Sequence, residues 1–328
     1  MSSIRWRAGT LGMLVVMLGP AAAVAEAEES SGDVPPGYML VGGDMLFPIP
    51  AVASLSVPEP QLWPAGIVPY EFAPQITDEQ QAQFRRAMAE WVAVADVMFI
   101  PRDGEDVHIH IRPGEYDDVS NATVGPGFGQ TYVNVGTNHW TAKWTLVHEL
   151  GHTLGTKHEH ERSDRLDYII PRLENVDPEF AGNFNTEDDA EIFGPYDFDS
   201  IMHYGPCNFS ICDSCWDDVA NCATIEVHPD YADEYAGVIG QRDHLSDGDI
   251  AGMVHNYGLP NSVFVDVTYS GDDETGEFLT PFTEFDPALE AVPSGGKVWL
   301  HGGSYEAVQT IDQAVHLRAF SGSATLGG

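Results

Sequence analysis

HELGHTLGTKHEHERSDRLDYI, at residues 148–169, is a stretch that predicts a metal site on a helix. If the segment is helical, His148 and His152 share one face, and both imidazoles can reach one ion at about 2.0–2.1 Å. Glu149 then lies beside them as a candidate base. His158 cannot come from the same helix face, so we expect Gly155 to break the helix and turn the chain back. Three nitrogens leave an open position for water and a carbonyl, which is typical of a catalytic zinc ion.

A second stretch, SIMHYG at residues 200–205, has the form of the methionine turn found beneath the metal in metzincins. Together the two stretches resemble the astacin family of zinc endopeptidases, whose form is HExxHxxGxxHExxRxDRxxY. The resemblance implies one Zn²⁺ per chain, with Met202 under the site and Tyr204 as a movable further ligand and oxyanion donor. It also implies that Glu159 holds the new N-terminus of the mature enzyme. Thr156 stands where the family commonly has Phe.

The resemblance extends over residues 38–258 and implies an α+β, two-lobed metzincin zinc-protease fold. A mixed sheet with helices forms the upper lobe, and the lower lobe is irregular. Thr77 and Gln80 predict a capping box at the start of a helix. We expect Thr141 to cap the zinc helix, and Asp247 with Asp249 to cap a later one. The expected strands are residues 67–72, 107–112 and 130–135.

The chain is predicted to contain four parts. Residues 1–25 read as a signal peptide, because Arg5 and Arg7 precede a short apolar run and a small-residue cleavage site. Residues 26–60 read as an extended propeptide with little core of its own. The catalytic domain is expected at residues 61–258, and an accessory segment at residues 263–328.

Within the propeptide, the turn Val41-Gly42-Gly43-Asp44 resembles the short element of astacin propeptides whose Asp binds zinc and keeps the precursor silent. Val41 stands where the family has an aromatic residue. A carboxylate carried on two glycines can approach a metal closely, which agrees with this role. An ordinary Gly-Gly-Asp turn is the alternative.

Charge restricts the partners. The chain has 51 acidic and 14 basic residues, a formal net charge of −37, with lysine only at positions 143, 157 and 297. Such a field repels nucleic acid and anionic membranes. Nucleic acid and membrane are therefore not expected as partners, whereas the astacin resemblance implies protein or peptide substrates. Solubility, a salty habitat or bound calcium are open explanations of the acidity.

The cysteines are confined to one loop after the methionine turn, at Cys207, Cys212, Cys215 and Cys222. Close, even spacing in an exported chain favours two local disulfides, with three pairings open. A second zinc site is the alternative, since CxxC occurs once. His108 and His110 share a strand face but lack a further ligand at metal-site spacing, so we interpret them as a polar strand face.

The final segment changes character. Short apolar runs alternate with Gly-rich turns, which resembles the start of a right-handed parallel β-helix of the pectate-lyase kind. Either the sequence is a truncated product, or this segment is a vestigial module for carbohydrate or surface docking. The prediction as a whole is a secreted zinc endopeptidase made as a latent precursor. A secreted binding protein with an incidental protease lobe is the rival, and the intact Glu149 argues against it.

Overall fold

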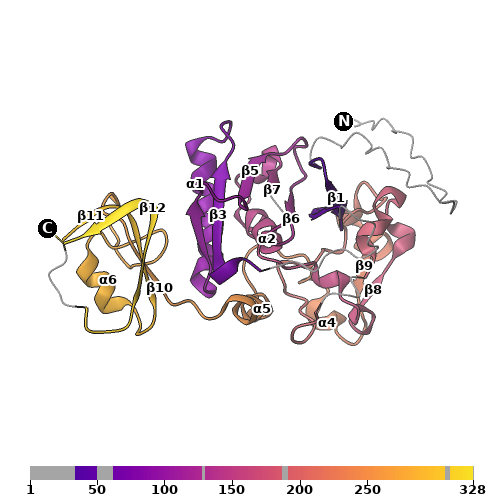
Figure 1. The fold of residues 1–328 in the computed structure, drawn as a ribbon. Coiled ribbons are helices and arrows are strands. Elements are labelled where there is room, and N and C mark those ends of the chain that lie inside the picture. Colours follow the sequence, from indigo (N-terminus) through magenta and orange to yellow (C-terminus); the bar gives the residue numbers. More distant parts are fainter. Residues whose placement is uncertain (1–33, 50–61, 128–129, 187–190, 307–310, 328) are drawn as a thin grey trace, which may run out of the picture.

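A computed structural model describes residues 34–49, 62–127, 130–186, 191–306 and 311–327. The predicted signal peptide lies outside these residues, and so does much of the predicted propeptide. Among the described residues, no helix is long and apolar enough to cross a bilayer. Figure 1 shows the sheet and its two long helices in the middle, with an irregular lobe on one side and the C-terminal strands on the other.

The upper lobe is built on a mixed sheet with the strand order β1-β2-β6-β7-β5-β3-β4. Helices α1 (Asp78–Val94) and α2 (Lys143–Thr153) share one core cluster with its strands. The Thr77–Gln80 capping box is confirmed, as is the strand at residues 67–72. The strands are β1 (Tyr38–Val41), β2 (Met45–Pro48), β3 (Ile67–Phe72), β4 (Met98–Pro101), β5 (Ile109–Pro113), β6 (Asn121–Thr123) and β7 (Thr131–Val135).

The two helix caps near the site differ from the predictions. Ala142 is the N-cap of α2 and makes no side-chain cap, so the assignment of Thr141 was wrong. In α5 (Asp247–Tyr257) the cap is Ser246, whose hydroxyl accepts a hydrogen bond from the Asp249 amide. Asp249 completes the capping box, and Asp247 lies in the first turn. The capping role of Asp249 is thus confirmed, and that of Asp247 was wrong. The errors at Thr141 and Asp247 arose because polar residues that can cap occur at several positions near each helix start, and the backbone angles decide among them.

The propeptide prediction also needs correction. Strands β1 and β2 form an antiparallel hairpin, and β2 pairs in parallel with β6. Met45, Leu46 and Phe47 of β2 are buried, so this segment carries core residues although its composition suggested none. Sparse apolar content was misleading because the three apolar residues are consecutive and are covered on both faces.

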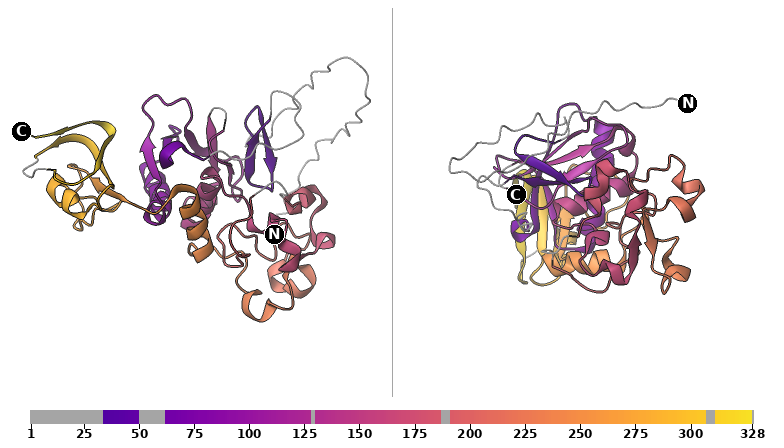
Figure 2. Two further views of the ribbon diagram at one scale, coloured as in Figure 1. Left: turned by 60° about the horizontal axis from the view of Figure 1, so that its bottom comes forward. Right: turned by 90° about the vertical axis from the view of Figure 1, so that its right-hand side faces the viewer.

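The lower lobe contains little regular structure. It includes β8 (Ile169–Pro171) and β9 (Ile225–Val227), with the short helices α3 (Val219–Cys222) and α4 (Ala232–Tyr235). Aromatic residues form much of its own core cluster; among them are Phe184, Tyr196, Phe198 and Tyr204. Figure 2 shows this lobe set apart from the sheet. The expected irregular lower lobe is thus confirmed.

The C-terminal unit has three parallel strands, β10 (Ser262–Val265), β11 (Lys297–Tyr305) and β12 (His316–Leu326), and the helix α6 (Phe285–Ala291). Phe264 and Trp299 join the main core cluster, and Lys297 Nζ lies 2.7 Å from both Asp96 carboxylate oxygens. The unit therefore packs on the catalytic lobe (Figure 1). A β-helix is not established by these three strands.

Gly151 of α2 lies against Met202 at the junction of the two lobes. A Cβ at Gly151 would come within 2.7 Å of Met202 Sδ and 3.1 Å of Thr156 Oγ1. Met202 is buried, so its side chain has little room to move. The methionine turn is held in turn by Asp249, which accepts hydrogen bonds from the Ile201 amide at 2.8 Å and the Ser200 hydroxyl at 2.6 Å.

We predict that Gly151→Ala destabilises the fold by about 1–3 kcal/mol, the usual range for overpacking a dense core. Gly252→Ala is the matched control, because it also replaces a helical glycine and its Cβ meets only Phe193 Cδ1 at 3.8 Å. The control should be neutral or stabilising by up to about 1 kcal/mol. Denaturant unfolding of the two variants beside the parent measures the difference, and equal midpoints would refute the tight contact.

Candidate metal centre

Two imidazoles of the site come from one face of α2. The His148 and His152 rings lie 4.7 Å apart between centroids and are buried. His148 Nδ1 is 2.8 Å from the Ile201 carbonyl oxygen, and His152 Nδ1 is 2.9 Å from that of Thr156. These carbonyls accept hydrogen bonds from Nδ1–H, so each Nε2 carries the lone pair, and both Nε2 atoms face the Asp44 carboxylate.

The third imidazole arrives after a turn. Gly155 has φ +99°, a left-handed conformation that favours glycine, and it reverses the chain after α2. The His158 ring consequently lies 4.7 Å from that of His152 and 5.4 Å from that of His148. His158 Nδ1 is 3.2 Å from Glu161 Oε2. Sequence reasoning missed Glu161, although the spacing of three residues from His158 was a usable signal.

Asp44 fills the space between the three rings. Its Oδ1 lies 3.0 Å from His158 Nε2 and 3.8 Å from His152 Nε2, and its Oδ2 lies 3.3 Å from His148 Nε2. The two glycines before it permit this approach. A Cβ at Gly42 would be 2.6 Å from Met45 Cε, and one at Gly43 would be 2.6 Å from Asn183 Nδ2. Both glycines also have positive φ, +62° and +82°.

These positions fit a four-coordinate zinc ion. With bonds of about 2.0–2.1 Å, the edges of a tetrahedron are roughly 3.3 Å long, close to the observed separations from Asp44. Asp44 Oδ1, His152 Nε2 and His158 Nε2 are buried and have no hydrogen-bond partner within the described chain. Buried polar atoms are rarely left this way, so a cation that accepts their lone pairs accounts for them.

The pKa shifts of the same groups also indicate that this cluster needs a positive charge. Burial lowers the pKa of His148 to about 4, with help from the Arg242 charge. Burial opposes protonation of His158 as well, but the Asp44 and Glu161 charges outweigh it and raise the pKa to about 10. Burial likewise opposes ionisation of Asp44, yet the His158 charge and the close contacts with His148 and His158 hold its pKa well below its usual range. Without a metal, one proton on His158 balances the Asp44 carboxylate.

Glu149 is buried next to this cluster, and its Oε2 has no hydrogen-bond partner in the described residues. Burial, together with the nearby Asp44 charge, raises the pKa of Glu149 well above its usual range. The carboxyl group is therefore available for proton transfer rather than committed to a structural contact.

Tyr204 approaches from the methionine turn. Its hydroxyl donates a hydrogen bond to the Gly42 carbonyl, and its ring stacks on His160 at 4.0 Å between centroids. His160 is buried and its Nε2 lies 3.0 Å from the Asn183 carbonyl oxygen. Burial and the Asp44 charge raise the pKa of Tyr204 well above its usual range, so the phenol stays protonated as a donor. Sequence reasoning did not single out His160, which supports this ring.

Glu159 lines a cavity of about 570 Å³, which His158 and Met202 also line. Its Oε1 accepts hydrogen bonds from the Asp197 amide at 2.8 Å and from Arg162 at 3.1 Å. Burial raises the pKa of Glu159 to about 7 despite the Arg162 charge. Arg162 also binds Asp164 at 2.8 Å, so these two residues brace the segment after the ligands. The cavity lining includes Leu62, Gly155, Glu159, Arg162, Asp197 and Asn256.

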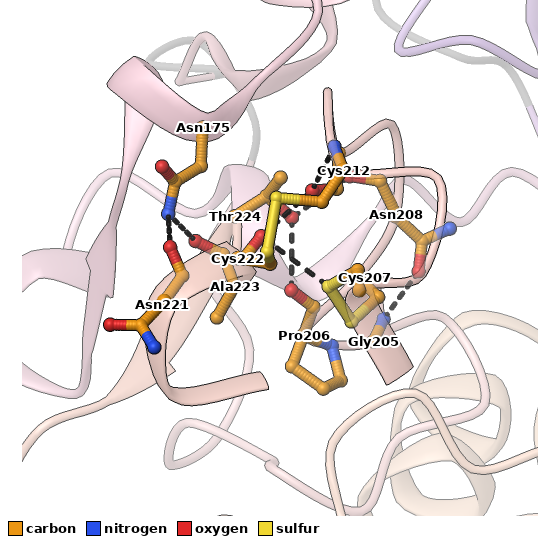
Figure 3. The surroundings of a disulfide bond; sticks show 12 residues. Asn175, Gly205, Pro206, Cys207, Asn208, Cys212, Asn221, Cys222, Ala223 and Thr224 are labelled. Atoms are coloured by element: carbon orange, nitrogen blue, oxygen red, sulfur yellow. Dashed lines mark hydrogen bonds between the residues drawn. A yellow bond between two sulfur atoms is a disulfide. The ribbon is translucent and has the colours of Figure 1, made fainter. Parts of the chain in front are cut away.

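The cysteine loop closes beside the site. The pairs are Cys207–Cys215 and Cys212–Cys222, so two local disulfides are confirmed and the alternative of a second zinc site there is wrong. Figure 3 shows how neighbouring side chains fasten the loop, with Asn175 donating to the Ala223 carbonyl at 2.8 Å. Cross-links of eight and ten residues constrain this loop and do not join the lobes.

His108 and His110 do have a partner, contrary to the sequence interpretation. Glu71 of the neighbouring strand β3 lies within hydrogen-bonding reach of both rings. The partner was invisible in the sequence because it lies 37 and 39 residues away and is brought close only by the pairing of β3 with β5.

Comparisons with known proteins agree with this geometry. The family model described as Astacin, a peptidase family, matches residues 56–258. Bone morphogenetic protein 1 of Xenopus laevis is 36% identical over 217 residues, which are 63% of this chain and 28% of that protein. Astacin-like metalloprotease toxin 5 of Loxosceles gaucho is 36% identical over 154 residues, 46% of this chain and 80% of the toxin. The solved structure of high choriolytic enzyme 1, a hatching enzyme zinc-protease from the medaka Oryzias latipes, matches with TM-score 0.53 and 28% identity over 61% of this chain and 94% of that one.

Proposed function

The chain belongs to the astacin family of metallopeptidases, and we propose that it is an exported zinc endopeptidase made as a latent precursor. The observation that carries the proposal is the set of three cleft-facing Nε2 atoms closed by one carboxylate. His148, His152 and His158 would hold the ion. Zinc bound there polarises a carbonyl and lowers the pKa of water toward neutrality.

Glu149 serves as the base in this proposal. It directly follows the ligand His148 in the sequence, is buried, and has one carboxylate oxygen without a partner among the described atoms. A carboxylate in this position accepts a proton from the attacking water and returns it to the leaving amine.

Tyr204 serves as the donor to the developing oxyanion. Its hydroxyl already donates to a backbone carbonyl, that of Gly42, which occupies the cleft beside the ligands. A scissile carbonyl placed similarly would receive the same hydrogen bond, and the bond would strengthen as negative charge develops.

Peptide chains are the proposed substrates, and the pairing of the β1–β2 hairpin with β6 supports an extended pose for them. The Ala122 amide of β6 donates to the Asp44 carbonyl at 2.7 Å, and the Val124 amide donates to that of Leu46 at 3.1 Å. Once the hairpin leaves, β6 becomes the edge of the sheet. An extended peptide can then add to that edge through the same backbone groups.

Latency is proposed to rest on Asp44, which takes the fourth position of the zinc site. The hairpin also fills the cleft with buried side chains, because Met45 and Phe47 pack with Val124. The carboxylate excludes water from the ion, and the strand excludes substrate from β6.

Maturation would then use the cavity beside Glu159. Cleavage within residues 50–61, which lie outside the described chain, would create an α-amino group close to Leu62 at the cavity lining. Glu159 is a buried acid at that lining, and an ammonium group gives it a second partner of opposite charge besides Arg162. Neutralisation of a buried carboxylate by such a pair is favourable when hydrogen bonds are also made.

The C-terminal strands are proposed as a docking unit for carbohydrate or another surface, built on the β-helix-like pattern of the sequence. The parallel register of β10, β11 and β12 supports the β-helix-like part of this proposal. Export follows from the predicted signal at residues 1–25, and the two disulfides suit an oxidising compartment.

We predict that processed protein hydrolyses casein and loses this activity with 1,10-phenanthroline. Glu149→Ala should retain zinc and lose at least about 100-fold in kcat, because the ligands survive and the proton acceptor does not. Zinc content and casein hydrolysis are measured together. Glu277→Ala, at an exposed site of the C-terminal unit, is the control and should keep both. Retention of a tenth of the parent kcat would assign the proton transfer to another group.

We predict that Tyr204→Phe in processed protein lowers kcat by about 10²–10³-fold and changes KM little, as expected for a donor that acts mainly in the transition state. Tyr305→Phe is the control, since it removes a buried tyrosine hydroxyl that donates to the His301 carbonyl outside the cleft. Peptide-cleavage kinetics of both variants give the comparison. An unchanged kcat for Tyr204→Phe would remove this residue from the mechanism.

We predict that unprocessed Asp44→Ala precursor cleaves peptide, whereas the unprocessed parent does not. Leu40→Ala is the control, because Leu40 is an exposed residue of the same hairpin and its loss leaves the carboxylate in place. Mass spectrometry must show that residues 26–61 are intact in each sample. Silence of intact Asp44→Ala precursor would mean that the hairpin blocks the cleft by bulk alone.

A further inference from the structure

A second cluster of ligand-type side chains lies on the sheet face opposite the helices. In β5, Ile109 and Ile111 belong to the core cluster with α1 and α2, so alternation places His110, and His108 just before the strand, on the other face. Glu71 of β3 pairs directly with His110 in the parallel register. Two histidines at alternate positions and one glutamate from the next strand therefore converge.

The separations match those of ligands on one ion. Glu71 Oε1 lies 3.0 Å from His110 Nδ1 and 3.3 Å from His108 Nε2. All three atoms lie within 4.8 Å of one another. A tetrahedral zinc ion with bonds of about 2.0–2.2 Å needs ligand separations of roughly 3.3 Å, so little movement would admit it. The amide nitrogen of Gln130 lies 3.5 Å from His108 Nε2 and closes one side.

A neighbouring charge orients the carboxylate ligand. Arg102 Nη1 binds Glu71 Oε2 at 3.0 Å, which leaves Oε1 toward the histidines. A carboxylate beside two imidazoles is a donor set that suits divalent transition metals.

We propose that Glu71, His108 and His110 form a second metal site, which binds Zn²⁺ or a similar divalent transition ion. The ligands share no residue with the centre on α2. His108 is 4% exposed, which fixes one ligand in the wall of the sheet, while His110 and Glu71 are partly open to solvent and give the ion a path of entry. The site is independent of the proposed peptidase activity and needs no processing of the chain.

Metal content of the full precursor tests this proposal. Protein stripped with chelator is dialysed against buffered Zn²⁺, and the ions per chain are counted by plasma mass spectrometry. The parent should hold two ions. The double variant Glu71→Gln with His110→Phe should hold one ion. Glutamine has nearly the same shape as glutamate, and phenylalanine keeps an aromatic ring against Tyr132. His316→Ala, at an exposed histidine of β12, is the control and should hold two.

A complementary variant separates the two centres. His148→Ala with His152→Ala should lose one ion and keep the one bound by Glu71, His108 and His110. A parent with one ion that this variant loses would overturn the second site. Two ions in the Glu71→Gln and His110→Phe variant would place the extra ion elsewhere and would also overturn it. Failure of the peptidase proposal would appear instead as absent casein hydrolysis with the second ion still bound.

Circular dichroism of each variant accompanies the counts. If the double variant does not fold, His110→Phe alone is measured, because it removes one ligand from the outer sheet face and leaves the Arg102–Glu71 pair. We expect at least a tenfold weaker binding of the second ion in this single variant. Unchanged binding of two ions would contradict the assignment.

Discussion

A half-buried carboxylate against three buried imidazoles is the constraint around which the catalytic lobe is organised. Charge removed from water is costly unless it is paired, and the Asp44 carboxylate is enclosed by His148, His152 and His158. Each ring is fixed from behind by a different segment. Ile201 of the methionine turn, Thr156 after α2, and Glu161 accept from the three Nδ1 atoms. The orientation of the ligands thus depends on contacts between both lobes and the hairpin.

Basic residues are scarce, and several of those present are used for specific internal contacts. Arg165 donates to the carbonyls of His160, Phe184 and Asn185, which ties the segment after the ligands to the lower lobe. Lys143 pairs with Glu90 of α1, and Lys297 pairs with Asp96. These pairs connect one element to another at the places where a strongly acidic chain would otherwise repel itself.

Local patterns predicted what depends on local spacing. The four-residue interval in α2, the glycine at 155 and the capping box at Thr77 each specify backbone geometry within one or two turns. The pairing of β2 with β6 and the approach of Glu71 to His110 depend on register between strands distant in the sequence, which no short motif encodes. The caps at Ala142 and Ser246 were misassigned because the helix start is decided by the whole lobe. Roles of the site residues remain predictions, although the structure brings the predicted ligands together.

The β1–β2 hairpin contributes to the metal site and to the sheet at the same time. Asp44 supplies the charge that the imidazoles require, and the next residues supply the strand that β6 lacks. Removal of the hairpin would therefore leave two neighbouring groups without partners. One is the ligand position that Asp44 had filled, and the other is the pair of backbone amides of Ala122 and Val124. A peptide in extended conformation is a ligand that meets both. Autoinhibition and substrate binding would then depend on the same unsatisfied groups. In the precursor, Gly42 and Gly43 allow the hairpin backbone to approach them closely.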